Sequence, residues 1–129
     1  MRKSEITPEL IELSKRAKEL GFPQIVCVGD WYEINGKPVL CNYAHGTLRG
    51  FNPEEHSLIL SFSRCLEWLW ERGWKIITSS YPEYTRVTVG RKDGSINPEI
   101  TKIATSHHEA IAKAVVKILE GGCLKKSRS

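Results

Sequence analysis

The pattern of apolar and polar residues predicts its clearest helix late in the chain, over residues 106–120. Ser106 and Glu109 have the spacing of a capping box at its start, and two glycines, Gly121 and Gly122, follow its end. The apolar residues between fall on one half of a helical wheel: Ala110, Ile111, Ala114, Val115, Ile118 and Leu119. The chain before it has the pattern of a β-meander, so we expect this helix to cover a small sheet.

The first helix is predicted near the N-terminus. Thr7 is typical of an N-cap and Pro8 of the first helical position. An apolar stripe with spacings of three and four follows and ends at Gly21: Leu10, Leu13, Ala17 and Leu20. Its outer face carries charges of both signs, which is typical of a solvated surface.

A β-hairpin is predicted next, from residues 30–34 and 37–41. The Asn35-Gly36 pair between them accepts positive φ at both central positions, which makes it a strong hairpin signal. Pro38 has no backbone donor, so it begins its strand or its strand lies at a sheet edge. The short apolar run 25–28 is a further candidate strand.

Residues 54–72 have two interpretations. They form one long helix, or residues 58–60 are extended and a shorter helix begins near Ser61 or Ser63. Both interpretations make the part from Ser63 to Arg72 helical.

Three strands of a meander are then predicted, over residues 75–79, 84–89 and 100–103. Residues 54–120 therefore have the order α-β-β-β-α. We predict an α+β fold in which helices pack on an antiparallel β-meander.

A chain of 129 residues suits a single domain, 1–129. The pattern also allows a subdivision into a helix with a hairpin, 5–50, and an α-β-β-β-α part, 51–122. Hydrophobic content of 40% and charged content of 26% are ordinary for a globular chain and argue against disorder. The net charge of +4 comes largely from residues near the two ends: Arg2, Lys3, Lys125, Lys126 and Arg128.

The sequence pattern predicts no membrane anchor and gives no sign of an oxidising compartment. No apolar run approaches the roughly 18 residues that span a bilayer, and the N-terminal segment is charged where a signal peptide is apolar. Four cysteines stand at positions 27, 41, 65 and 123 without a Cys-x-x-Cys pair. We expect reduced thiols and a cytoplasmic protein.

A zinc site would have to combine Cys41 and His45, which are close in sequence, with Cys27 from a neighbouring segment. The opposing interpretation treats both cysteines as small apolar residues. The spacing favours the second interpretation, so we expect no metal and no cofactor.

Catalytic patterns are weak. His107 and His108 point about 100° apart on a helix, which prevents chelation of one ion, and we expect them to be neutral polar residues of the first turn. Cys65 lies on an apolar helix face, and Ser79-Ser80 has no oxyanion signature beside it. These patterns predict a protein that is not an enzyme, although catalytic groups that converge from unmarked positions stay an alternative.

The alternating strand 84–89 offers a nucleic-acid surface. Tyr84, Arg86 and Thr88 fall on one face, where an aromatic beside an arginine can stack on bases and meet phosphate. The basic pair Lys125 and Lys126 would add charge. The simpler interpretation is cross-strand packing on a solvent face.

The four tryptophans divide into two groups. We expect Trp70 and Trp74 to lie in the core. Trp68 points away from the predicted apolar stripe, and Leu60 does so if the helix is continuous. Such a pair forms either a second core layer, which we favour, or a partner-binding surface.

The helix that begins Thr105-Ser106-His107-His108-Glu109-Ala110 resembles the closing helix of double-stranded-RNA-binding domains, which also have the order α-β-β-β-α. That family carries a Lys-Lys-x-Ala-Lys cluster on RNA phosphates. Ala110 alone agrees with it here, and the lysines are absent.

A second resemblance covers about residues 60–120. The motifs are Leu66-Glu67-Trp68-Leu69, Arg72-Gly73-Trp74, and Thr105 with Glu109-Ala110-Ile111 and Ala114. They resemble small phage and prophage proteins of Gram-positive bacteria with a phage α/β sandwich domain. This resemblance implies a helix packed on a sheet and transfers no chemistry.

The sequence thus predicts a non-enzymatic cytoplasmic binding protein, encoded by a phage, that acts on an unidentified protein partner. Nucleic-acid binding is the alternative, and a small enzyme or zinc protein is the third.

Overall fold

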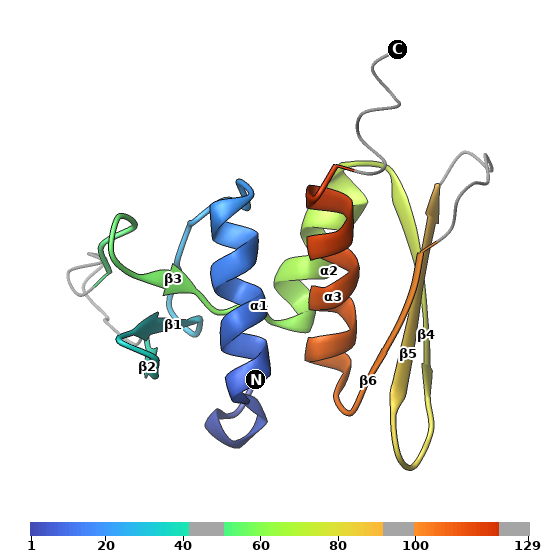
Figure 1. Ribbon diagram of the computed structural model, residues 1–129, viewed down its shortest axis with the longest axis horizontal. Helices are drawn as coiled ribbons and strands as arrows, with labels where there is room; N and C mark the ends of the chain where they lie inside the picture. The colour runs from blue at the N-terminus through green and yellow to red at the C-terminus, as the bar shows by residue number, and fades with distance from the viewer. Residues whose placement is uncertain (42–50, 92–99, 122–129) are drawn as a thin grey trace. The chain divides into compact units, whose positions relative to one another are not determined.

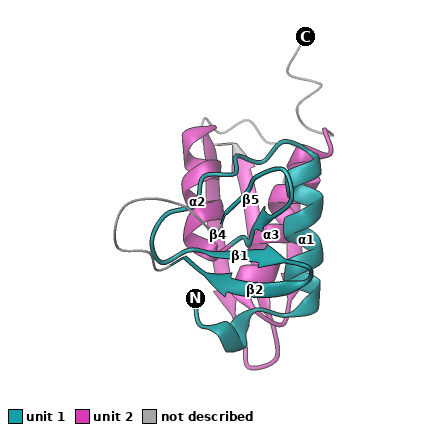
Figure 2. Ribbon diagram, turned by 90° about the vertical axis from the view of Figure 1, so that its left-hand side faces the viewer, with its two compact units in different colours: residues 1–60 teal, residues 61–129 magenta. Residues whose placement is uncertain are grey.

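A computed structural model of the protein describes residues 1–41, 51–91 and 100–121. Within these ranges the chain forms three α-helices and two three-stranded antiparallel sheets, so the fold is α+β as the sequence predicts (Figure 1). The chain divides into two compact units, residues 1–60 and 61–129 (Figure 2). Each unit contains one of the two sheets.

The first unit begins with a short 3-10 turn, Lys3–Glu5, and the helix α1, Pro8–Glu19. The predicted cap is confirmed, because the Thr7 hydroxyl oxygen accepts the Leu10 N–H at 3.1 Å. The buried side of α1 carries Leu10, Ile11, Ser14 and Ala17.

The predicted hairpin is also confirmed, as β1, Trp31–Ile34, and β2, Lys37–Leu40. Asn35 and Gly36 between them have φ of 52° and 82°, the positive values of a type I′ turn. The strand order is β2-β1-β3, so Pro38 lies on an edge strand, where its missing donor costs no ladder hydrogen bond.

Residues 25–28 do not form a strand, and that prediction is wrong. The Cys27 N–H donates to the Asp30 carboxylate at 2.7 Å, and the Asp30 N–H donates to the Cys27 carbonyl at 2.9 Å. This turn satisfies the Cys27 N–H and carbonyl locally, so these two groups need no sheet partner. Ile25 and Val28 stay exposed, at 63% and 65%.

The strand β3, Ser57–Leu58, pairs antiparallel with β1 and completes the first sheet. Helix α1 meets this segment through the buried Ser14. Its hydroxyl donates to the Leu10 carbonyl at 2.8 Å and accepts the Leu60 N–H at 2.9 Å. The first unit therefore extends to Leu60, beyond the boundary near residue 50 that the sequence predicted.

The second unit opens with helix α2, Phe62–Glu71. Ser61 caps it, because its hydroxyl oxygen accepts the Arg64 N–H at 3.3 Å. With β3 immediately before it, the alternative of an extended segment and a short helix is confirmed. The single long helix over 54–72 is wrong.

The predicted meander is confirmed as β4, Trp74–Ser80; β5, Thr85–Arg91; and β6, Ile100–Ala104. The order is β4-β5-β6, with β5 in the centre. The register sets Ile77 opposite Thr88, and Thr88 opposite Thr101.

The last helix, α3, His107–Leu119, covers this sheet as predicted. Ser106 caps it by accepting the Glu109 N–H at 3.2 Å. Helices α2 and α3 lie on the same face of the sheet (Figure 1). The core between sheet and helices contains Trp74, Val87, Val89, Ile100, Ala110, Ile111, Ala114 and Val115.

Candidate functional site

The face of the second sheet opposite α2 and α3 is a candidate surface that draws residues from all three strands. Val87 and Val89 point to the core and are fully buried, so Arg86 and Thr88 point the other way. The register adds the outward residues of β4 and β6. We call this surface the outer sheet face: Lys75, Ile77, Ser79, Arg86, Thr88, Thr101 and Ile103.

Two isoleucines expose large apolar areas on the outer sheet face. Ile77 on β4 is 56% exposed and Ile103 on β6 is 50% exposed. Arg86 on the central strand is the direct cross-strand neighbour of Ile103, and Thr88 is that of Ile77. The two isoleucines therefore flank a polar centre.

The turn between β4 and β5 adds an aromatic cluster at one end of this face. Tyr81 and Tyr84 have ring centroids 4.8 Å apart, and Tyr81 is 42% exposed. The Arg86 guanidinium donates to the Tyr81 hydroxyl at 3.0 Å and lies 5.7 Å from its ring centroid. The guanidinium therefore lies beside the Tyr81 ring.

The nucleic-acid residues predicted from sequence are brought together only in part. Arg86 and Thr88 share the outer sheet face, but Tyr84 belongs to the turn before β5. Tyr81 is the aromatic that contacts Arg86, and it lies outside the alternating strand 84–89 that the sequence pattern marked. Lys125 and Lys126 lie outside the described residues.

The hydroxyls of Thr88 and Thr101 lie 3.1 Å apart across β5 and β6. This pair is the cross-strand packing that the simpler interpretation predicted for a solvent face. It coexists with the exposed isoleucines and does not cover them.

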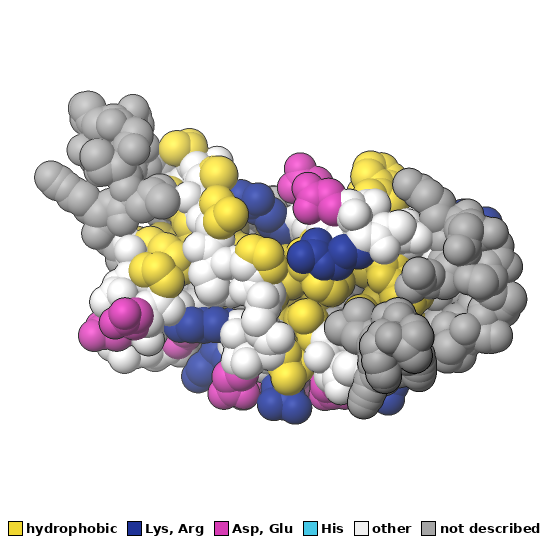
Figure 3. Space-filling view, turned by 90° about the horizontal axis from the view of Figure 1, so that it is seen from above, with side chains coloured by type: hydrophobic (Ala, Val, Ile, Leu, Met, Phe, Trp, Pro, Cys, Tyr) yellow, Lys and Arg dark blue, Asp and Glu magenta, His cyan; other side chains and the backbone are white. Residues whose placement is uncertain are grey.

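The charge on the outer sheet face is positive but small. Its described strand positions carry two cations, Lys75 and Arg86, and no carboxylate. On the face that Figure 3 shows, charges of both signs are interspersed, with no large area of one sign among the described residues. The pattern differs from the concentrated basic face of a typical nucleic-acid-binding domain.

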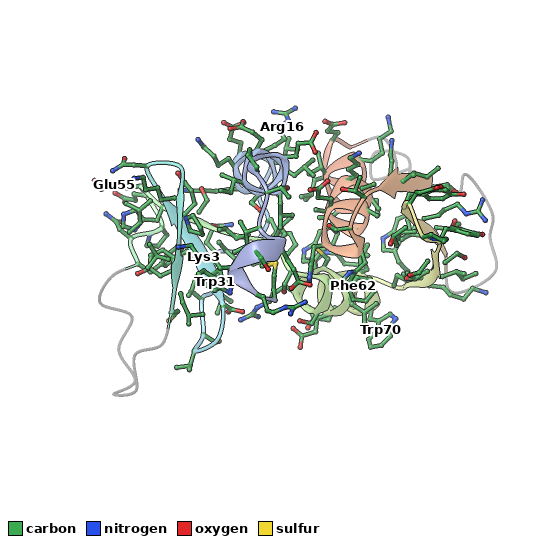
Figure 4. The ribbon with its side chains drawn as sticks, turned by 90° about the horizontal axis from the view of Figure 1, so that it is seen from below. Lys3, Arg16, Trp31, Glu55, Phe62 and Trp70 are labelled. Atoms are coloured by element: carbon green, nitrogen blue, oxygen red, sulfur yellow. The ribbon has the colours of Figure 1, made fainter. Side chains whose placement is uncertain are left out.

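The partner surface considered for Leu60 and Trp68 is wrong. Leu60 is fully buried and Trp68 is 6% exposed, which agrees with the favoured core interpretation. Trp74 is buried as expected, but Trp70 is 53% exposed and projects away from α2 (Figure 4). It shares one side of the helix with the half-buried Phe62 and Leu66.

The proposed zinc ligands do not form a described cluster. Cys27 is exposed and Cys41 is buried, whereas His45 lies outside the described residues. In the described parts of the chain, no three His, Cys, Asp or Glu side chains are grouped to hold a metal ion.

The two adjacent histidines serve helix packing. His108 is buried, and its Nδ1 accepts the Phe62 N–H, the first of α2, at 2.9 Å. An accepting nitrogen carries no proton, as the expectation of a neutral side chain requires. The His107 ring packs between its neighbours, 4.0 Å from the His108 ring and 5.2 Å from the Phe62 ring.

Burial raises the pKa of the Cys65 thiol. A thiol that resists ionisation is a poor nucleophile, so this cysteine is inert as predicted.

Comparison with protein-family models, with curated proteins and with solved structures found no match. Among the described residues, no helix combines the length and the apolar character needed to cross a bilayer.

Proposed function

We propose that this protein is a non-enzymatic binding protein whose outer sheet face docks on another protein. The observation that carries the proposal is the pair Ile77 and Ile103, both at least half exposed, around Arg86. Isoleucines on a sheet are normally buried by the helices or sheet that pack on that face. An exposed apolar group surrounded by polar residues is typical of an interaction surface.

The energies support this assignment. Full burial of an isoleucine side chain contributes roughly 1.5–3 kcal/mol. Two isoleucines and the exposed part of Tyr81 therefore offer a compact apolar centre, with Arg86 supplying directional hydrogen bonds. Lys75 and Arg86 favour a partner with acidic side chains beside its apolar ones.

The test uses a displayed library of random peptides, selected on the immobilised full chain. We expect the selected peptides to be apolar and acidic, and to lose at least about tenfold in affinity for the I77S/I103S double variant. Ile25→Ser is the matched control, because Ile25 is 63% exposed in the first unit. Peptides that bind the double variant as tightly as the parent, or that fail equally on Ile25→Ser, would disprove the proposal.

Single-stranded nucleic acid is the second candidate for the same face. The specific observation is the cluster of Tyr81, Tyr84 and Arg86, since aromatic rings beside a guanidinium stack on bases. With two cations on the face, we expect a shallow salt dependence, with a log–log slope of magnitude below about 1.5.

A fluorescent oligothymidylate tests this candidate by anisotropy. If the face binds single strands, Arg86→Gln and Tyr81→Ala weaken binding, while Arg16→Gln, an exposed arginine on α1, does not. Equal loss for Arg86→Gln and Arg16→Gln would leave only general electrostatic attraction and reject the candidate.

The proposal includes a cytoplasmic location and a phage origin. Cys27, Cys41 and Cys65 are unpaired thiols, which supports a reducing compartment. The phage origin is supported by the motif around Arg72-Gly73-Trp74 alone. Fractionation of the native host would contradict the location if the protein were recovered outside the cytoplasm.

A further inference from the structure

The strand edges of the two described sheets differ in how open they are. Edge strands offer unpaired backbone groups, and proteins obstruct them with proline, lysine or short length. In the first sheet, β2 contains Pro38 and β3 has two residues. In the second sheet, the Lys113 ammonium donates to the Ile103 carbonyl on β6 at 3.1 Å.

The edge of β4 carries one of these obstructions, a single lysine, Lys75, at the second position of the strand. The strand is seven residues long, contains no proline, and pairs with β5 on one side only. It is also uncovered on both faces in its second half. Ile77 points outward and is exposed, and Thr78 and Ser80 point toward the helix side yet are exposed as well.

The sequence of β4 fits an antiparallel copy of itself. Ile77 is the middle residue of Trp74–Ser80. An antiparallel pairing centred there sets Ile77 opposite its counterpart, and Lys75 opposite Ser79 of the second copy. The exposed isoleucines would cover each other, and the two lysines would stay apart, which avoids like charges opposite each other.

We propose that the occupant of the β4 edge is a second copy of this chain, and that two β4 strands pair antiparallel about Ile77. In this register residues opposite each other share a face, so the two outer sheet faces join across the symmetry axis. The choice of a second copy over another peptide rests on this match of apolar and charged positions along β4.

The pairing is testable by sedimentation of the full chain from about 5 to about 500 µM, because a small interface gives concentration-dependent association. We expect the wild type to shift from monomer toward dimer. Ile77→Lys places two ammonium groups opposite each other and should weaken association at least about tenfold. Ile103→Lys, the same change on the same face, should leave it intact.

A symmetric disulfide gives a second readout. Opposed residues of antiparallel strands have Cα atoms about 4.5–5.5 Å apart, within disulfide range. In a chain with Cys27→Ser and Cys123→Ser, we expect Ile77→Cys to crosslink two chains under mild oxidation and Ile103→Cys to remain uncrosslinked.

A wild type that stays monomeric throughout, equal weakening by the two lysine variants, or equal crosslinking of the two cysteine variants would overturn the proposal. The pairing shares Ile77 with the proposed function, but the two fail separately, because a chain that stays monomeric would overturn the pairing and leave peptide binding through Ile77 and Ile103 unaffected.

Discussion

The buried hydroxyl of Ser14 joins two backbone segments of the first unit. It donates to the Leu10 carbonyl within α1 and accepts the N–H of Leu60 after β3. Ser14→Ala would leave that buried N–H without its acceptor, which costs about 1–3 kcal/mol in the free energy of unfolding. Urea denaturation measures this loss.

The exposed Ser4 supplies the control for this measurement. Ser4→Ala should change the free energy of unfolding by less than about 0.5 kcal/mol. If the two variants were equally stable, the hydroxyl of Ser14 would not be the link between α1 and the segment after β3.

The Cys65 thiol predicts a change in stability at alkaline pH. Its pKa is raised by burial from an ordinary value of 9.0, so above pH 9 the unfolded chain loses a proton that the folded chain keeps. Unfolding then becomes more favourable as pH rises, by up to about 1.4 kcal/mol per pH unit. Cys65→Ala should remove this part of the slope between about pH 9 and 10.5, as measured by denaturant unfolding. Identical slopes for the two proteins would contradict the effect.

The tryptophans of α2 show how far the spacing of apolar residues along a helix predicts the burial of a single side chain. The sequence placed Trp68 off the apolar stripe in a favoured second core layer, and Trp68 is buried; it placed Trp70 in the core, and that prediction is wrong because Trp70 is 53% exposed. The buried arc of α2 is centred on Cys65, with Leu69 on one flank and Trp68 on the other. A ten-residue helix with apolar residues on most sides does not define that centre by itself.

The hairpin turn between β1 and β2 depends on backbone conformation. Gly36 has φ of 82°, where an L side chain is strained. Gly36→Ala should therefore lower the free energy of unfolding by about 1–2 kcal/mol, as measured by thermal denaturation. Asn35→Gly keeps a residue that tolerates positive φ, so it should lower the free energy of unfolding only by the entropic cost of glycine, less than about 1 kcal/mol. A loss for Asn35→Gly that equals the loss for Gly36→Ala would contradict this explanation.

Local signals determined most of the elements. The caps Thr7 and Ser106 and the Asn35-Gly36 turn each act within a few residues, and each was predicted correctly. The segment at β3 could not be decided in this way, because its pairing with β1 joins residues far apart in the sequence. Residues 25–28 failed for the opposite reason, since a single carboxylate, Asp30, diverts the chain into a turn.

At the scale of the whole molecule, each unit contains its own buried thiol. Cys41 is buried in the first unit and Cys65 in the second, whereas Cys27 is exposed. In a chain with Cys123→Ser, we expect Cys27 to react with a disulfide reagent at least about a hundredfold faster than the other two. Mass spectrometry of labelled peptides gives the three rates, and denaturant should abolish the differences. Fast labelling of Cys41 in the native protein would contradict its burial.

Only part of the outer sheet face could be predicted from the sequence, because the rest depends on how the whole sheet is assembled. Alternation along β5 is a local pattern, so Arg86 and Thr88 were placed correctly on one face. Ile77 and Ile103 join them only through the register of three strands, and Tyr81 through the closure of a turn. Register and closure depend on contacts across the fold, which a linear pattern does not specify.

The contact of Lys113 with β6 limits how many copies of the chain the second sheet could add. A sheet open at both margins could add copies without end and lengthen into a fibril, as amyloid does. With Lys113 bonded to the Ile103 carbonyl, the second sheet has one margin suited to addition. Among the described residues, a pairing of two β4 strands would therefore use the more open margin of each sheet and leave outward the two margins that carry Lys113.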